Sequence, residues 1–163
     1  MVHIIHVLAC IFNIFANLIN DLFITKTNTY EIHPHLHRCG AMGTPIENAT
    51  AIKIMIDHHE SPDDFATYAY CVPSMSSTCE MVYNFIEFLE QTSLIDKTIG
   101  TCLYTGILTD SGSFRYPKTT GRTHRIVAEF IDLGVENSNI PNLLFDNNSY
   151  NRLQLLGRAL QNM

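Results

Sequence analysis

A short and nearly uninterrupted apolar segment, Ile52–Ile56, constrains the fold of this chain more than any other feature. Only Lys53 breaks the run. A strand that is apolar on both faces has to be covered on both sides, which is typical of parallel sheets with helices packed against them. Because the chain after this segment reads mostly as helices, the sequence predicts part of an α/β layer architecture. It comprises a parallel sheet flanked by helices and a largely helical C-terminal half.

Four helical regions are predicted after the strand, from caps, breakers and apolar stripes of helical spacing. The first is expected to begin at the capping box of Ser77 and Glu80. The second is expected from about Asp96 to Thr109, and the third from Thr119 or Thr120 to Gly134. The last is expected from Pro141 to the chain end. The side chains expected to face the core of the first three are Met81, Val82, Phe85, Ile86, Leu89, Ile99, Leu103, Ile107, Ile126, Val127, Phe130 and Ile131.

Composition narrows the class of protein. The 163 residues fit one domain, and ten Lys and Arg against sixteen Asp and Glu give a net charge of −6. This charge argues against binding of long nucleic acid through a basic surface, but short nucleotides stay open if a cation offsets the carboxylates. The five cysteines include no C-x-x-C pair. That usage indicates a reducing cytoplasm rather than a disulfide scaffold.

The first apolar segment, Val2–Ile24, has three interpretations. It contains polar residues at spacings that place them on one helical stripe, namely His3, His6, Asn13, Asn17 and Asn20. An amphipathic or buried helix fits this pattern. A membrane or secretory segment is disfavoured by these polar interruptions and by the absence of Lys or Arg before Lys26. The third interpretation is a start that is not native to the domain.

Three polar residues, Asp57, His58 and His59, follow the predicted strand directly. Ligands of open α/β sheets bind at the carboxyl ends of strands. Imidazole nitrogens and carboxylate oxygens there suit Mn²⁺, Zn²⁺ or Fe²⁺. The simpler interpretation is a solvated strand end before the acidic turn Glu60–Asp64, and a bare triplet does not decide between the two.

Asp110 is a second candidate site residue. It continues the stripe of Ile99, Leu103 and Ile107 at steps of 4, 4 and 3, so the sequence predicts an inward-facing carboxylate. It also falls at the C-terminal end of the predicted helix, where the helix dipole disfavours an anion by about 0.3–1 kcal/mol. Such an acid needs a nearby cation. Arg115 as an ion-pair partner and a metal shared with the histidines are both open.

Three separated motifs carry a resemblance to a known family. The segments are IMIDHHESPDDFA, SMSSTCE and GILTDSGSFRY, and they occur in the family's order. The chain resembles the DHH phosphoesterase superfamily, most closely bacterial oligoribonucleases of the NrnA type that also dephosphorylate 3′-phosphoadenosine 5′-phosphate. The resemblance covers about residues 36–163. It implies a Rossmann-like DHH domain, here incomplete, and a metal-dependent phosphoesterase in the cytoplasm.

The resemblance also implies roles for individual residues. The implied metal ligands are His58 and Asp110, with Asp57 supporting the cluster and counted among both the metal and the catalytic residues. His59 is implied to face the scissile phosphate, and a weaker role in phosphate binding falls on Arg115 and Thr78. The implied cofactor is Mn²⁺, two ions in the complete enzyme. The implied partners are short RNA or a nucleoside 3′,5′-bisphosphate, with no long duplex and no membrane, and a homodimer is left open.

The chain departs from the family pattern before residue 36. The first motif, H-x-x-x-D-x-D, has no counterpart in residues 1–40, and Ile32 stands where a metal-bridging Asp is expected. The family's C-terminal substrate-binding domain also has no counterpart. We therefore expect residues 1–35 to be a divergent or non-native segment and residues 36–163 to be the C-terminal portion of a DHH domain. At most one weak metal site and impaired activity follow. A non-catalytic remnant that binds a partner or a membrane is the alternative.

The divergent segment contains a histidine-rich tract of its own. Its members alternate along the chain as His33, His35, His37 and Cys39. On a strand they would share one face and form a plausible zinc cluster. Pro34 weakens a regular strand, and a short histidine-rich tract is a compositional hint only.

Overall fold

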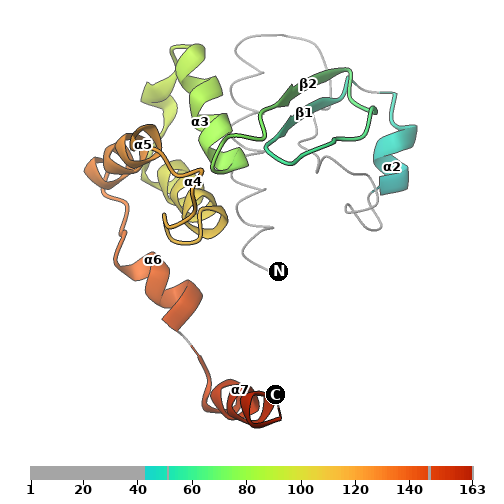
Figure 1. Ribbon diagram of the computed structural model, residues 1–163. Coiled ribbons are helices and arrows are strands. Elements are labelled where there is room, and N and C mark those ends of the chain that lie inside the picture. The colour runs from blue at the N-terminus through green and yellow to red at the C-terminus, as the bar shows by residue number, and fades with distance from the viewer. Residues whose placement is uncertain (1–42, 51, 147, 163) are drawn as a thin grey trace.

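The computed structural model describes residues 43–50, 52–146 and 148–162 (Figure 1). Some sequence predictions lie outside these residues. They concern the segment Val2–Ile24, the position of Ile32, and the tract of His33, His35, His37 and Cys39. The division of the chain near residue 35 therefore stays a prediction.

Two parallel strands hold the site in place. After the short helix α2 (Gly43–Asn48), β1 (Ile54–Asp57) and β2 (Tyr68–Cys71) pair along their whole length, so both end at the same edge. The predicted α/β class with a parallel sheet is confirmed. The strand was expected to include Ile52, which instead lies before β1 and is 41% exposed. β1 begins at Ile54 because its pairing with β2 begins there, opposite Tyr68, so Ile52 falls outside the paired residues.

β2 is absent from the sequence predictions. Its sequence, Tyr68–Cys71, does not alternate between polar and apolar residues, and Tyr68 and Tyr70 are exposed. Four residues also give too little periodicity to separate a strand from a loop. The pairing with β1 alone defines this strand, and pairing across a crossover is a tertiary property.

Three helices pack beside the strands (Figure 1). They are α3 (Thr78–Phe88), α4 (Lys97–Asp110) and α5 (Gly121–Asp132), with the turn η2 (Thr92–Leu94) between the first two. Their N-caps are Ser77, Asp96 and Thr120, and each side chain accepts a hydrogen bond from a backbone N–H in the first turn. α3 contacts β1, α4 and α5, so it links the sheet to the helical layer. The predicted helices are confirmed to within a few residues.

The core lies between these helices and β1. Most of the expected core residues are buried, namely Met81, Val82, Ile86, Leu103, Ile107, Ile126, Val127 and Phe130. Phe85, Leu89 and Ile99 are only partly buried. Ile131 was expected to face the core and is 39% exposed. The apolar stripe of α5 is narrower than the sequence pattern, because this helix packs against α3 and α4 from one side only.

A buried polar network connects α3 to α5. The sequence pairs Ser77 and Glu80 as a reciprocal capping box, but only half of it forms: the Ser77 hydroxyl accepts from the Glu80 N–H at 3.0 Å. The Glu80 carboxylate, 2% exposed, instead accepts from the hydroxyls of Ser76 and Thr123. The reciprocal box occurs at the start of α5, between Thr120 and Thr123. A partner supplied by another helix therefore displaced the local cap.

The C-terminal region is helical in pieces. α6 (Asn139–Pro141) runs into the π-helical turn η3 (Asn142–Asp146), and α7 (Tyr150–Gln161) follows. α7 buries no residue, and several of its leucines are exposed, namely Leu153, Leu155, Leu156 and Leu160. In the described part of the chain no helix has the length and apolar content that crossing a bilayer requires.

Candidate functional site

The end of β1 delivers three polar side chains to one edge of the sheet. Asp57 is the last residue of the strand and is 4% exposed, and its carbonyl accepts from the N–H of Val72 at 3.1 Å. His58 and His59 follow where the backbone leaves the strand. The edge is formed by the carboxyl ends of both strands, which is where α/β sheets bind ligands. The sequence prediction of this position is confirmed.

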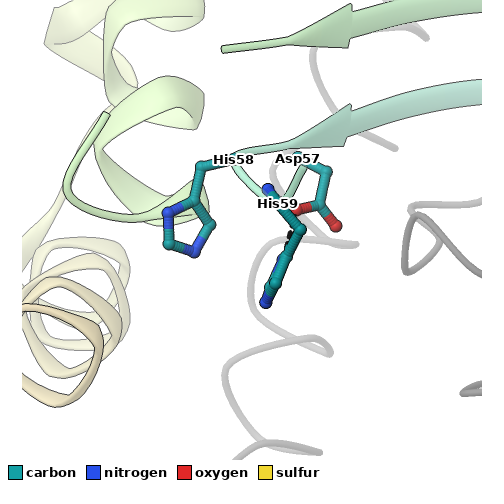
Figure 2. Close-up of side chains that lie close together, drawn as sticks. All are labelled: Asp57, His58 and His59. Carbon is teal, nitrogen blue, oxygen red and sulfur yellow. Dashed lines mark hydrogen bonds and ion pairs between the residues drawn. The ribbon is translucent and has the colours of Figure 1, made fainter. Parts of the chain in front are cut away.

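Asp57 orients His59 (Figure 2). Its Oδ1 accepts from the His59 backbone N–H at 2.8 Å and lies 2.6 Å from the His59 Nδ1. Because a carboxylate only accepts, Nδ1 carries a proton, and Nε2 is the ring nitrogen that faces away from Asp57. The His59 side chain is 42% exposed. A buried acid thus fixes the imidazole at its Nδ1, and the ring is partly exposed to solvent.

His58 is held in the complementary way. Its Nδ1 lies 3.2 Å from the carbonyl oxygen of Met75, just before α3, and so donates to it. Its Nε2 lies 3.6 Å from Oδ2 of Asp110. Metal-binding histidines typically donate one ring N–H to a carbonyl or carboxylate, which leaves the other nitrogen as the ligand atom. The His58 ring has this arrangement.

Asp110 closes the group from the end of α4. It is the last residue of that helix, and its side chain is 44% exposed, so the prediction of an inward carboxylate is corrected. The stripe of α4 leaves the core at its final turn, and Asp110 emerges at the edge of the sheet. Burial raises the pKa of its carboxyl, His58 and His59 oppose that rise, and Asp57 adds to it.

Arg115 is not the cation beside Asp110. Its Nε donates to the carbonyl oxygen of Gly112 at 2.8 Å, and its side chain is exposed. Among the described residues, the group that lies against the Asp110 carboxylate is the His58 ring, which is a cation only when both of its nitrogens are protonated. The ion pair between Asp110 and Arg115, one of the two interpretations of the sequence, is therefore replaced by a pairing with the histidine.

The donor set and spacing fit a divalent metal. Ligand atoms of Asp57, His58 and His59 all lie within 4.8 Å of one another. Two ligands each about 2.0–2.2 Å from one ion are separated by at most about 4.4 Å. The 3.6 Å between His58 Nε2 and Asp110 Oδ2 meets this limit, whereas the 4.8 Å spread of Asp57, His58 and His59 exceeds it, so His58 and Asp110 are the pair spaced to share one ion. Mixed imidazole and carboxylate ligands suit Mn²⁺, Zn²⁺ or Fe²⁺.

A cavity of about 320 Å³ adjoins His58 and Asp110. Its other described lining residues come from the start of α3 and the loop after α4, namely Ser76, Ser111, Tyr116, Pro117, Lys118 and Thr119. Neither Thr78, the first residue of α3, nor Arg115 lines it. The sequence analysis singled out those two for phosphate and missed the lining residues. Ser76 lies in the second motif, and Ser111 and Tyr116 lie in the third, so the motifs could have indicated part of the lining. The cavity itself forms only when these two distant segments meet.

The matching family model gives the class of protein. Residues 33–107 match the family described as "DHH family, N-terminal domain". This part of the chain belongs to the DHH family, and the recognition made from the motifs is confirmed. Asp110 lies three positions beyond the matched residues.

Individual relatives narrow the comparison. The bifunctional oligoribonuclease and PAP phosphatase NrnA of Thermus thermophilus is 36% identical over 122 residues, which are 73% of this chain and 35% of that protein. The protein of the same name from Bacillus subtilis is 30% identical over 66% of this chain and 34% of its own length. The crystal structure of an exopolyphosphatase-related protein from Bacteroides fragilis is similar with a TM-score of 0.79 at 29% identity, over 93% of this chain and 45% of that one. The chain spans about a third of the length of these curated relatives.

Proposed function

We propose that this chain forms the histidine-bearing side of a metal-dependent phosphoesterase site for short oligoribonucleotides or 3′-phosphoadenosine 5′-phosphate. The names of the two NrnA relatives support this substrate class. The observation that carries the proposal is the approach of His58 Nε2 to Asp110 Oδ2 at 3.6 Å, next to an Asp57–His59 pair. Family membership alone would not place these groups at one sheet edge.

Each residue has a separate task in this proposal. His58 and Asp110 hold Mn²⁺, and the buried Asp57 supports the cluster. A bound divalent ion would polarise the phosphoryl group and lower the pKa of a bound water. His59 is fixed through its Nδ1–H by Asp57. In its imidazolium form, with a proton on each ring nitrogen, it would donate Nε2–H to the phosphoryl oxygens and stabilise the charge that builds on them.

Low activity is part of the proposal. A two-metal mechanism needs ligands on both sides of the scissile phosphate, and His58 and Asp110 supply one side. Ile32 stands where the family pattern has a bridging carboxylate. Residues 36–163 would then act as part of a DHH domain with one weak metal site. The cytoplasmic location and a homodimer stay predictions.

Manganese binding tests this function directly. The full chain is titrated with Mn²⁺ and free ion is followed by electron paramagnetic resonance, for the wild type, His58→Gln and the matched control His124→Gln. We expect His58→Gln to weaken binding at least about tenfold, since even residues that only support a metal ligand cost that much. His124 lies on α5, and its ring contacts Phe114 at 5.6 Å, so its substitution should leave the affinity unchanged. Equal affinities in all three proteins would overturn the proposal.

Hydrolysis separates the two functions that the sequence leaves open. Release of phosphate from 3′-phosphoadenosine 5′-phosphate and of mononucleotides from a short RNA is measured with Mn²⁺. Slow metal-dependent release that rises in Ile32→Asp supports an impaired enzyme. Metal and nucleotide binding without any release in either protein would indicate the competing function, a non-catalytic binding module.

A further inference from the structure

The cavity beside His58 has a wall that the phosphoesterase site does not use. It is formed by the loop after α4, where Tyr116, Pro117, Lys118 and Thr119 follow one another. Its volume of about 320 Å³ is at the low end of small-molecule sites, which span about 300–1,000 Å³. The space therefore suits a single nucleotide unit rather than a longer strand.

One polar atom in this wall has no partner. Among the described residues, the Oγ1 of Thr119 is the one buried side-chain nitrogen or oxygen atom that has no hydrogen-bond partner. The neighbouring hydroxyl of Thr120 caps α5, so the helix start does not need Thr119. Buried hydroxyl groups in proteins are nearly always paired, and an exception calls for an explanation. The atom has almost no accessible surface, so a ligand in the cavity would supply the missing partner once the Thr119 side chain turns toward it.

The loop that positions Tyr116 is unusual in its backbone. Gly112, Ser113 and Phe114 have φ values of 58°, 59° and 63° in succession. Left-handed residues other than Gly are uncommon and gather at functional sites, where packing holds them. The Phe114 ring provides such packing, because it contacts Tyr104 at 6.0 Å between centroids.

Gly112 also sets the place of the Tyr116 ring. A Cβ added at Gly112 would lie 2.5 Å from that ring, so the ring rests directly on the glycine. Tyr116 is nevertheless 58% exposed, which leaves aromatic surface at the cavity. The residue is thus fixed on one side and accessible on the other.

We propose that this cavity binds the nucleoside next to the scissile phosphate, with its base against Tyr116 and one of its polar groups hydrogen-bonded to Thr119 Oγ1. The inference rests on the proposed function, which places the metal at His58 and Asp110 and the phosphoryl oxygens beside that metal and His59. A second phosphate in the cavity is disfavoured, because the Asp110 carboxylate lies in its wall and Lys118 is its one described cation. Aromatic rings bind any base by stacking, so the site selects nucleotides over inorganic phosphate without reading sequence.

Binding of adenosine 5′-monophosphate and of inorganic phosphate tests the inference. Both are titrated by calorimetry into the full chain with Mn²⁺, for the wild type, Thr119→Val, Tyr116→Leu and the control Thr101→Val. The Thr101 hydroxyl donates to the carbonyl of Lys97 on α4, away from the cavity lining. We expect Tyr116→Leu to weaken nucleotide binding at least about fivefold, in line with base stacking. Thr119→Val should weaken it severalfold without lowering the melting temperature, since no protein hydrogen bond is lost.

The readouts separate failure of this inference from failure of the function. Nucleotide affinity that is unchanged in both cavity variants overturns the nucleoside site, as does a wild type that binds Mn²⁺ and phosphate but not the nucleotide. A lower melting temperature in Thr119→Val would show a structural role instead and also counts against it. A wild type that binds neither Mn²⁺ nor phosphate overturns the proposed function, and the inference with it.

Discussion

At the scale of single residues, two histidines that are neighbours in sequence differ in their surroundings. His58 has a backbone carbonyl behind it and the Asp110 carboxylate in front, at 3.2 and 3.6 Å. His59 has the buried Asp57 behind it at 2.6 Å. Both rings carry their proton on Nδ1 for the same reason, an acceptor fixed behind the ring. In the proposed function this difference makes His58, with Asp110 in front of it, the metal ligand, and His59 the group that faces the substrate.

Asp110→Asn tests the metal ligand with little change in shape. The substitution should reduce Mn²⁺ affinity at least about tenfold. It removes a partly buried negative charge from the C-terminal end of α4, so in metal-free buffer the free energy of unfolding should stay equal or rise by about 0.3–1 kcal/mol. Metal titration and urea unfolding measure the two effects. Loss of stability with unchanged Mn²⁺ affinity would make Asp110 a structural partner of His58.

His59→Ala tests the group that faces the phosphate. The imidazole touches Asp57 on one side, and we assign no metal to its other nitrogen. We expect Mn²⁺ affinity to change by less than about threefold, while 3′-phosphoadenosine 5′-phosphate binds about tenfold more weakly at saturating Mn²⁺, the loss of one charged hydrogen bond. Calorimetry gives both constants. A parallel loss of the two affinities would place His59 in the metal shell.

At the scale of elements, α4 is the part that organises the site. Its last residue faces His58, and the loop after it forms the cavity wall. Its first residue, Lys97, is tied to the segment after α5 by an ion pair with Glu136 at 2.9 Å. A shift of α4 along its axis would therefore move the site and the helical layer together.

The ion pair between Lys97 and Glu136 makes a small part of the stability depend on pH. The hydrogen bond and charge of Lys97 hold the pKa of the Glu136 carboxyl below its usual value of 4.5. A lowered pKa stabilises the fold above the usual value, and this contribution is lost as the pH falls through the lowered value. Lys97→Met should remove it, so the variant should lose less stability than the wild type between pH 5 and pH 3. Equal slopes in urea unfolding across this range, which is about 2 pH units around the usual glutamate value, would contradict the prediction.

At the scale of the whole molecule, stability is concentrated in α3, α4, α5 and β1. α7 buries no residue, so a chain ending at residue 148 should unfold at the same urea concentration within error. Ile126→Ala in the full chain is the comparison, because Ile126 is fully buried and its truncation should cost about 2–5 kcal/mol. A large loss on removal of α7 would show that its leucines pack against another part of the chain.

Patterns of local origin were readable in the sequence. β1 is indicated by the apolar run that ends at Ile56, and α3 by its cap Ser77. α5 is indicated by its cap Thr120 and by Gly134, which has a left-handed backbone just after the helix. Strand burial, capping and helix termination depend on neighbouring residues, so the sequence shows them. The three DHH-family motifs also indicated the residues of the candidate site. One buried strand followed by mostly helical segments sufficed for the fold class.

Tertiary structure decided the features that need partners from distant segments. β2 exists by its pairing with β1, and Glu80 leaves its local cap because Thr123 of another helix offers a hydroxyl. Asp110 finds His58 rather than Arg115, although Arg115 is much nearer in sequence. In each case the energy of the contact depends on where separate elements meet in space. Sequence spacing within one element carries no information about that meeting point.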